Sequence, residues 1–425
     1  MKLESVNKST YDINGSGCLP MGIGTRFRPL SLDVPKPLFP VAGSPMIQHH
    51  IEACSKISEV KEILIIGFYQ ANDDINQFIS AMISEYKMSI RYLQEYNPLG
   101  TAGGIYHFRD QIKSGNPDAF FLLNGDVCGD FPLQEMLEFH KSHSSRCKIT
   151  VLATEATSYQ AMNYGCIVEN KETHEVMHYV EKPSSFISNL INCGVYVCSL
   201  DIFGHVSQIF TEKQHEYYSM DFNEADISNK DAIMLERDIL MPFAGTNRLF
   251  VYQTNRWWSQ IKTAASAIYA NRHYLSLYKQ HHPERLAKFG GNQATIIGDV
   301  YIHPTASVHP TATLGPNVSI GKGASVGPGV RIRESIVLGA ATIQDHSCIL
   351  HTIVGWNSTI GSWSRVEGTP CDPNPNKPFT KMDNAPLFND DGKLNPSITI
   401  LGSYKRYLNP EFVAAGVIQV GVTDQ

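Results

Sequence analysis

A six-residue repeat in the last third of the chain restricts its fold more than any other sequence feature. From residue 294 onward the sequence runs in eight consecutive blocks of six residues. The first position of each block is small or aliphatic and the third is aliphatic, and Gly, Pro or His often falls between them. The two positions are occupied by Ala294, Val300, Ala306, Ala312, Val318, Ala324, Val330 and Ile336, and by Ile296, Ile302, Val308, Leu314, Ile320, Val326, Ile332 and Leu338. This pattern predicts a hexapeptide-repeat parallel (left-handed) β-helix, since stacked aliphatic side chains fill a narrow prism and Gly and Pro suit its corners.

The repeat weakens toward the C-terminus. Less regular blocks continue to about Val366, and the sequence from Cys371 onward is rich in Pro and Asn and ends without a hexad register. We therefore predict a β-helix over residues 294–370 and a C-terminal tail over 371–425. An uncapped last coil would expose unpaired strand edges.

The first 260 residues have a different texture, with short apolar runs alternating with amphipathic stretches. Strands are predicted at 62–68, 89–93, 119–123, 149–153, 164–169, 176–180, 191–197 and 249–252, and helices at 45–57, 73–86, 100–108 and 261–278. Such alternation predicts a doubly wound, mostly parallel α/β sheet over residues 22–260, followed by a helical linker over 261–290. The mixed, acidic segment 205–247 is interpreted as a helical insertion. Ligands are expected outside the carboxyl ends of the strands.

Composition excludes several classes of protein. The formal net charge of −6 argues against a general nucleic-acid surface. Nine cysteines without a CxxC pair are typical of reduced, intracellular thiols, and Cys193 and Cys198 are interpreted as core residues. The chain has no apolar run long enough for a transmembrane helix, and its first ten residues lack a secretory signal, so we expect a cytoplasmic protein that does not bind membranes.

A glycine-rich loop near the N-terminus is the first candidate site. Gly22 and Gly24, followed by Thr25, Arg26 and Lys36, would let the backbone approach a polyphosphate and would supply cations to its oxygens. A Gly-rich surface turn with solvated arginines is the alternative. The preceding stretch 12–21 consists of turn-forming residues, although a buried strand normally leads into such a loop, so we assign 1–21 as an atypical N-terminal segment.

The pattern GxGTRxxPLSxxxPKPL, read from Gly22 to Leu38, resembles the signature of sugar-1-phosphate nucleotidyltransferases, in particular the mannose-1-phosphate guanylyltransferase branch. That resemblance implies transfer of a guanylyl group from GTP to mannose 1-phosphate, giving GDP-mannose and pyrophosphate. It implies catalytic roles for Arg26 and Lys36. It further implies that the nucleotide is bound by Gly22, Gly24, Thr25, Gln94, Gly100, Thr101 and Gly103.

The same resemblance implies which residues contact the sugar phosphate and the metal. Sugar-phosphate contacts are expected from Asn163, Gly165, Glu181, Lys182 and Asn192. Asp126, directly after a buried strand, would be a Mg²⁺ ligand; on local grounds alone it could also be a turn residue.

One departure from the family pattern decides between two functions. Catalytic members carry a second metal-binding Asp in a Trp-x-Asp-Ile-Gly setting, whereas this chain has Gln260 at that position and Lys262 in place of the glycine. An amide contributes no charge, so Mg²⁺ binding should be weakened. The WSQIK pattern resembles the alpha, regulatory-type branch. That branch implies a subunit that binds GDP-mannose without needing a metal and modulates a catalytic beta-type partner, forming oligomers with itself and with that partner.

Three alternatives remain open from the sequence. The chain could be an active guanylyltransferase that uses GTP and Mg²⁺, or a structural scaffold without a ligand. The histidines of the repeat (His303, His309, His346 and His351) also raise acyl transfer, in which a β-helix His acts as general base. His303 and His309 precede Pro at corner positions, which favours plain corner residues.

Overall fold

A computed structural model describes residues 15–21, 27, 29–32, 34–219, 232–288, 294–368, 398–407 and 412–413. These residues fall into two compact units, which we describe separately. The sheet unit comprises residues 1–22, 50–125 and 131–255, and the coil unit comprises 23–49, 126–130 and 256–425. Of the helices in the described ranges, none has the length and apolar composition needed to cross a membrane.

The sheet unit follows the predicted alternation of strands and helices. Its elements are β1 (Gly15–Met21), β4 (Val60–Gly67), α2 (Asp73–Tyr86), β5 (Ser89–Gln94), α3 (Gly100–His107), α4 (Arg109–Ile112), β6 (Ala119–Leu123), α5 (Leu133–Ser142), β8 (Ile149–Glu155), α6 (Ser158–Ala161), β9 (Gly165–Glu169), β10 (Val176–Glu181), β11 (Leu190–Ser199), α7 (Ile202–Ser219), the π-helix η4 (Leu235–Leu240), α8 (Met241–Phe243) and β12 (Leu249–Gln253). Helix α1 (Met46–Ser55) crosses the boundary between the two units.

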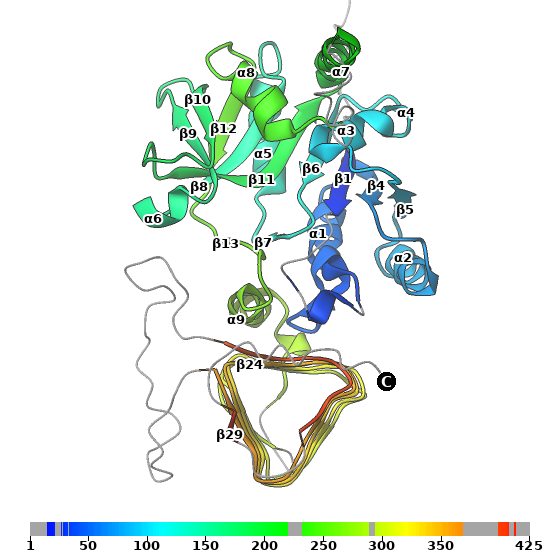
Figure 1. Cartoon of the computed structure of the whole chain (residues 1–425), viewed down its shortest axis with the longest axis vertical. Helices are drawn as coiled ribbons and strands as arrows, with labels where there is room; N and C mark the ends of the chain where they lie inside the picture. Colours follow the sequence, from blue (N-terminus) through cyan, green and yellow to red (C-terminus); the bar gives the residue numbers. More distant parts are fainter. Residues whose placement is uncertain are drawn as a thin grey trace, which may run out of the picture. The chain divides into compact units, whose positions relative to one another are not determined.

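These strands form one sheet in the order β10-β9-β11-β6-β1-β4-β5, with β8 beside β11 and β12 beside β8 (Figure 1). Strands β6, β1, β4 and β5 are parallel, whereas β11 is antiparallel to β6, β8 and β9. The sheet is therefore less uniformly parallel than the alternation alone predicts. Its largest core cluster includes Phe120, Leu122 and Tyr196, and Cys198 is part of it, while Cys193 is also buried, as predicted.

Strand β1 corrects the interpretation of the N-terminal segment. Residues Gly15–Met21 pair in parallel with β4 along their whole length and with β6 from Gly15 to Cys18. Pro20, which lacks an N–H group, lies beyond the residues paired with β6. Backbone hydrogen bonds from a strand on each side thus override the turn propensity of the local sequence.

The coil unit contains the predicted β-helix and the segments packed against it. Its elements are η2 (Leu30–Leu32), η3 (Lys36–Leu38), β2 (Pro40–Val41), β3 (Ser44–Pro45), β7 (Val127–Gly129), β13 (Trp258–Gln260), α9 (Ser266–His281), η5 (Pro283–Arg285), β14 (Thr295–Ile296), β15 (Val300–Ile302), β16 (Ser307–Val308), β17 (Thr313–Leu314), β18 (Val318–Ile320), β19 (Ser325–Val326), β20 (Arg331–Arg333), β21 (Ile336–Val337), β22 (Thr342–Ile343), β23 (Cys348–Leu350), β24 (Thr352–Val354), β25 (Thr359–Ile360), β26 (Arg365–Glu367), β27 (Thr399–Leu401), β28 (Arg406–Tyr407) and β29 (Phe412–Val413).

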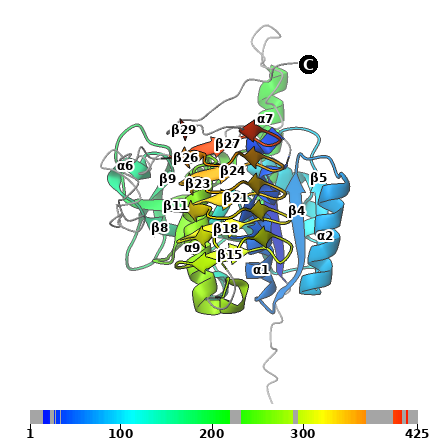
Figure 2. The same cartoon turned by 90° about the horizontal axis from the view of Figure 1, so that it is seen from below.

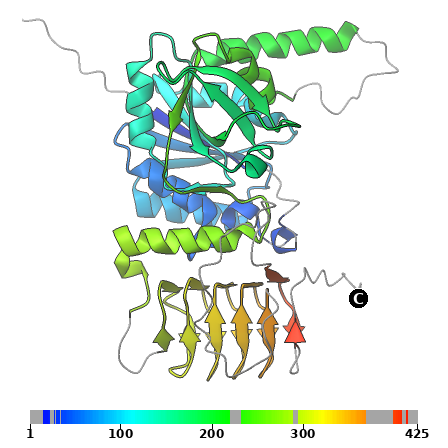
Figure 3. The ribbon, with the colours of Figure 1, turned by 90° about the vertical axis from the view of Figure 1, so that its left-hand side faces the viewer.

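The strands from β14 onward stack into three parallel sheets that make the three sides of a triangular prism (Figure 1). One of these sheets runs β15-β18-β21-β24-β27, and its strands lie one above the next (Figure 2). The coils follow one another along the prism (Figure 3). Leu314, Ile332 and Ile349 belong to the aliphatic core inside it, which confirms the β-helix prediction.

The last coil comes from a part of the chain predicted to be a tail. Strands β27, β28 and β29 pair with β24, β25 and β26, so residues from Thr399 to Val413 add a further coil to the prism. The prediction that this end lacks a repeat register is wrong. The reason is that residues 369–397, which lie outside the described ranges, separate this coil from the earlier ones and hide its register in the sequence.

The hexad frame also shifts by one residue at β21. Val337, rather than Ile336 or Leu338, lies in the prism core, and Val337 pairs with Ile320. Ile336 and Leu338 instead join a second cluster that includes Ala267 and Leu275 of α9. The frame shift thus supplies this face with apolar side chains for the helix. Asn271 of α9 is fully buried. Its side chain joins α9 to β18 and to the segment after β2 by accepting hydrogen bonds from Ser319 Oγ and Ala42 N.

Candidate functional site

Asp126 is the centre of a small polar group in the coil unit, which we call the Asp126 centre (Lys36, Asp126 and Gln260). Asp126 directly precedes β7, and β7 pairs antiparallel with β13, so that Gln260 lies opposite Val127. The Ile261 N–H donates to the Asp126 carbonyl at 2.8 Å. These backbone pairings bring the predicted metal ligand and the residue that replaces its partner together.

Both carboxylate oxygens of Asp126 already accept protein hydrogen bonds. Lys36 Nζ lies 3.0 Å from Oδ2 and forms an ion pair with it, and Gln260 Nε2 donates to Oδ1 at 3.2 Å. The Lys36 side chain is only 8% exposed, whereas that of Asp126 is 32% exposed. The lysine therefore depends on this carboxylate for charge compensation.

The predicted sugar-phosphate residues gather in the sheet unit around Asn192, and we call Gly165, Tyr179, Glu181, Asn192 and Tyr196 the Asn192 cluster. Asn192 Nδ2 donates to the hydroxyl oxygens of Tyr179 at 3.0 Å and Tyr196 at 2.8 Å. The Tyr179 hydroxyl donates in turn to Glu181 Oε2 at 3.0 Å. The buried Asn192 amide thus has hydrogen-bond partners, and the chain of bonds fixes the Glu181 carboxylate.

Two glycines contribute to this cluster in different ways. Gly165 pairs with Glu181 across β9 and β10, and a Cβ atom there would lie 2.0 Å from the Tyr179 hydroxyl. Gly194 has a φ of +71°, and its N–H donates to Asn192 Oδ1 at 2.8 Å. The pairing of β11 with β8 shifts register between Asn192 and Tyr196. This irregularity in β11 explains how a polar side chain is held within an otherwise apolar strand.

Lys182 and the segment Asn163–Gly165 lie beside the cluster. The Lys182 N–H donates to the Tyr164 carbonyl at 3.1 Å, and Lys182 Nζ lies 3.0 Å from Glu181 Oε1. The Lys182 side chain is exposed, as a residue that contacts a charged ligand would be. The structure thus brings together Gly165, Glu181, Lys182 and Asn192 of the five residues predicted to contact the sugar phosphate, and Asn163 directly precedes Tyr164 in the chain.

Glu236 on η4 is a residue that the sequence analysis missed. Burial raises the pKa of its carboxyl, and the Glu181 carboxylate raises it further while Lys182 opposes the change. Glu236 therefore lies within electrostatic reach of the Asn192 cluster. It sits in the acidic segment without clear periodicity, so only the structure reveals its neighbours.

The predicted nucleotide loop is hydrogen-bonded to residues 232–238 of the acidic segment that also contains Glu236, and we call these residues the strap. Helix α3 begins at Gly100, whose φ is +72°, and the N–H groups of Ala102 and Gly103 donate to the Ile233 carbonyl at 3.0 and 3.1 Å. A Cβ atom on Gly100 would lie 2.6 Å from that carbonyl oxygen. The glycines thus have a packing role here, in addition to the nucleotide contacts predicted for Gly100, Thr101 and Gly103.

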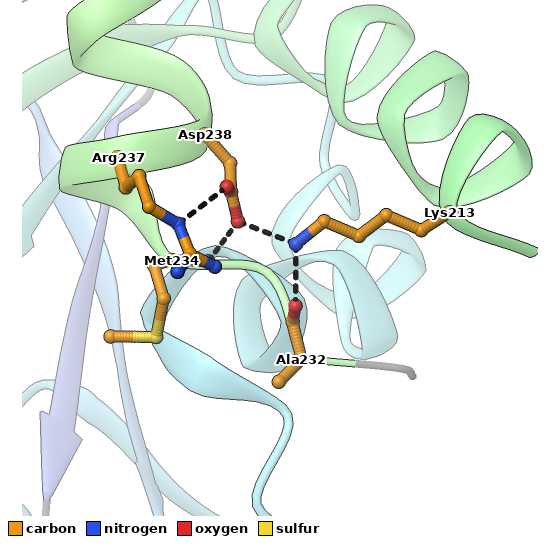
Figure 4. Close-up of polar contacts among 5 residues, drawn as sticks. All are labelled: Lys213, Ala232, Met234, Arg237 and Asp238. Atoms are coloured by element: carbon orange, nitrogen blue, oxygen red, sulfur yellow. Dashed lines mark hydrogen bonds and ion pairs between the residues drawn. The ribbon is translucent and has the colours of Figure 1, made fainter. Parts of the chain in front are cut away.

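Asp238 anchors this strap (Figure 4). Its carboxylate accepts hydrogen bonds from the Met234 N–H at 2.8 Å, Lys213 Nζ at 2.7 Å and Arg237 Nε at 3.1 Å. Lys213 also donates to the Ala232 carbonyl at 2.8 Å. Although burial opposes ionisation, these donors lower the pKa of Asp238, so the anchor keeps its charge.

The remaining predicted residues are placed as follows. Gln94 ends β5 and accepts a hydrogen bond from the Ala71 N–H at 3.4 Å. Gly22, Gly24, Thr25 and Arg26, the core of the predicted phosphate loop, lie outside the described residues.

Two β-helix histidines hydrogen-bond within their own corners. The Nδ1 atoms of His303 and His309 lie 2.9 Å from the hydroxyls of Thr305 and Thr311 and accept the N–H groups of the same threonines at 3.2 Å. These contacts favour the corner interpretation over acyl transfer.

Comparisons with known proteins show the family of this chain. The nucleotidyl transferase family model matches residues 19–276, and the model of the GMPPB C-terminal domain matches residues 296–415. Mannose-1-phosphate guanylyltransferase regulatory subunit alpha-A of Danio rerio is 61% identical over 379 residues, 89% of each chain. The regulatory subunit alpha of Homo sapiens is 57% identical over the same length and coverage. The chain belongs to the mannose-1-phosphate guanylyltransferase family.

A solved structure supports the fold. A chain from Bacillus anthracis, described as a glucose-1-phosphate thymidylyltransferase, matches with a TM-score of 0.50 and 18% identity, covering 65% of this chain and 97% of that one. The family models also reach the last residues of β1, from Leu19 to Met21, and extend across the last coil, the two regions that the sequence patterns alone did not predict.

The Asp126 centre of this family member does not suit Mg²⁺. A protein site for Mg²⁺ offers carboxylate and other oxygens, whereas here an ammonium group and an amide N–H₂ already occupy the two oxygens of Asp126. Within the described residues, no three His, Cys, Asp or Glu side chains gather closely enough to hold a metal ion.

Proposed function

We propose that this chain is a regulatory-type subunit of mannose-1-phosphate guanylyltransferase, which binds GDP-mannose and modulates GDP-mannose synthesis by a catalytic beta-type partner. The names of the similar proteins from Danio rerio and Homo sapiens support this proposal. The single observation that carries it is the state of Asp126. Its negative charge is compensated by Lys36 inside the protein, and Gln260 supplies no second charge.

Weak metal binding separates recognition from reaction. Guanylyl transfer needs the charge of the phosphates to be neutralised while the attacking and leaving oxygens are held in line. With the Asp126 carboxylate paired to Lys36, Mg²⁺ would have to displace an ammonium ion from a largely buried position. We therefore expect little or no turnover of GTP and mannose 1-phosphate by this chain alone, and ligand binding without a required metal.

The Asn192 cluster supports the binding half of the proposal. Glu181 is fixed by Tyr179, and its carboxylate can accept hydrogen bonds from sugar hydroxyls. The exposed ammonium of Lys182 adjoins it and can pair with a phosphate oxygen. These groups match the two parts of a sugar phosphate.

Two measurements on the purified chain test this function. Calorimetric titration with GDP-mannose should show binding in buffer that contains a metal chelator. A pyrophosphate-release assay with GTP, mannose 1-phosphate and Mg²⁺ should show no turnover above background, and adding the chain to the catalytic partner should change the partner's rate. Robust turnover by the isolated chain would favour the active enzyme instead. If the folded chain fails to bind GDP-mannose and leaves the partner's rate unchanged, a structural scaffold is the better description.

We place this function in the cytoplasm, in keeping with the composition of the chain and its cysteines. The proposed assembly contains further copies of this chain together with the catalytic partner. Size-exclusion chromatography with light scattering, with and without that partner, tests the assembly.

A further inference from the structure

The sheet unit contains a cavity that lies apart from the residues of the candidate functional site. It has a volume of about 690 Å³, within the size range of small-molecule sites. Its lining comes from α5, the ends of β8, β9 and β12, the turn between β9 and β10, and the residues that lead into β11. None of the residues predicted to contact nucleotide, sugar phosphate or metal lines it.

Glu169 is the most unusual group in this lining. Its side chain is only 10% exposed, and its Oε1 atom accepts a hydrogen bond from Gln253 Nε2. The buried Oε2 atom makes no hydrogen bond, although His174 Nδ1 lies 3.5 Å away. A buried carboxylate oxygen without a donor is unfavourable, so a ligand that supplies one would be stabilised here.

The walls beside Glu169 are aromatic and aliphatic. Phe139 and Tyr252 line the cavity and meet edge to face with their ring centroids 5.7 Å apart. Ile167, Leu190 and Val251 complete the apolar surface and are themselves buried. Aromatic faces attract cations as well as apolar groups, whereas they offer little to a phosphate.

The charges around the cavity point the same way. The lining contains the carboxylates of Glu155 and Glu169, the ammonium of Lys171 and the imidazole of His174. Lys171 and Glu155 are exposed to solvent, so Glu169 carries the one charge that is nine-tenths buried. An anionic ligand such as a nucleotide would be repelled by this carboxylate, whereas a cationic ligand would be attracted to it.

We propose that this cavity binds a small organic ammonium ion. The charged nitrogen pairs with the Glu169 carboxylate, and the apolar body of the ligand lies against Phe139 and Tyr252. This site is separate from the GDP-mannose site and does not depend on the function proposed above.

Matched probes test the charge. Benzylammonium and benzyl alcohol have similar size and shape and differ in the cationic head group. We expect saturation-transfer NMR on the full chain to detect benzylammonium, with an affinity roughly tenfold or more above that of benzyl alcohol, as expected for a hydrogen bond to a charged group. Equal binding of the two probes, or no saturation transfer to benzylammonium, would overturn the proposal.

Matched variants test the residue. Glu169→Gln keeps the shape of the side chain and should weaken benzylammonium binding roughly tenfold or more. Glu172→Gln changes an exposed carboxylate in the neighbouring turn and should leave the affinity unchanged. Glu155→Gln, at an exposed position of the lining, should weaken binding only about twofold and tests the site even if Glu169→Gln unfolds. Undiminished benzylammonium binding by a folded Glu169→Gln variant would contradict the assignment. So would a Glu155→Gln variant that binds benzylammonium as tightly as Glu172→Gln does.

Discussion

The Asn192 cluster and the Asp126 centre contain similar kinds of side chains but treat their carboxylates differently. Glu181 is held by the Tyr179 hydroxyl and lies beside Lys182, whose side chain is exposed. Asp126 is paired with Lys36, whose side chain is buried. The first lysine can turn to a ligand without leaving a buried charge behind. The second cannot, because its own ammonium is buried and would lose the carboxylate that balances its charge.

On the proposed function, this difference is how a nucleotidyltransferase fold keeps recognition and loses reaction. Contacts with sugar hydroxyls need fixed acceptors, which the hydrogen-bond chain through Asn192 supplies. Metal-assisted transfer needs uncompensated negative charge, whereas Lys36 compensates the charge of Asp126 and Gln260 adds no second negative charge. On the proposed function, a few contacts in the coil unit separate the two activities, while the sheet fold stays the same.

The largest effect should come from breaking the Asn192 cluster. Asn192→Ala removes the amide that bonds the buried hydroxyls of Tyr179 and Tyr196 and the Gly194 N–H, and of the two hydroxyls that of Tyr179 keeps its bond to Glu181. We expect the free energy of unfolding to fall by about 3 kcal/mol and GDP-mannose binding to be lost. Urea denaturation and calorimetry measure the two effects.

The control for this variant is Asn76→Ala, at an exposed position of α2. It should change the free energy of unfolding by less than about 0.5 kcal/mol. If Asn192→Ala is destabilised but binds GDP-mannose as tightly as the original chain, the cluster is structural only.

The next effect tests whether Lys36 depends on Asp126. Asp126→Asn leaves the buried ammonium without an anion, and we expect the free energy of unfolding to fall by about 2 kcal/mol, less than for a fully buried pair because Asp126 is partly exposed. Adding Lys36→Met removes the stranded charge and should restore much of the loss. A double variant as unstable as the sum of the two single variants would show that the pair is not coupled.

A gain of metal binding should follow from restoring the missing carboxylate. Gln260→Asp places a second acid beside Asp126 and removes the amide donor to its Oδ1. We expect Mn²⁺ affinity to rise about tenfold, or about 1.4 kcal/mol, as measured by electron paramagnetic resonance of free Mn²⁺. Gln134→Asp on α5 is the control and should have no effect. Unchanged affinity in Gln260→Asp would mean that Lys36, rather than the missing acid, limits metal binding.

The sequence predicted most of this architecture where a pattern repeats locally. Helix α2 matches its predicted span residue for residue, and the hexads predict the prism because each block repeats the same inward-facing positions. The family resemblance predicts that Asp126 and Gln260 occupy the two metal-ligand positions. The pairing of β7 with β13 confirms that the two side chains meet.

Structure was needed wherever the decisive contact is distant in sequence. Strand β1 exists because β4 and β6 lie on either side of it, which the turn-forming residues of 15–21 do not reveal. Residues 369–397 separate the last coil from the earlier ones, so its register cannot be predicted by extending the six-residue repeat. Lys36 and Asp126 are separated by 90 residues, and no local pattern predicts their ion pair.

The smallest effect concerns Glu95, a third way in which this protein treats a carboxyl group. Glu95 follows β5 and lies against Gly104 of α3, where a Cβ atom would come within 2.2 Å of its Oε1 atom. Burial raises the pKa of its carboxyl from 4.5 to about 7. The folded protein therefore holds this proton to a higher pH than the unfolded chain does, so its contribution to stability is greatest below about pH 4.5 and falls as the pH rises to about 7.

Glu95→Gln keeps a neutral side chain at every pH and should remove this slope. At pH 8 we expect the free energy of unfolding of the variant to be about 1 kcal/mol higher than that of the original chain. This is less than the full pKa shift implies, because solvent screens part of the effect. Urea denaturation at pH 5 and pH 8 measures the change, with Glu172→Gln as the exposed control. A stabilisation equal at both pH values would mean that the amide gains by packing alone. A clearly larger difference at pH 8 than at pH 5 would instead show that the sheet unit accommodates its buried acid by protonation, whereas the coil unit accommodates Asp126 with a lysine.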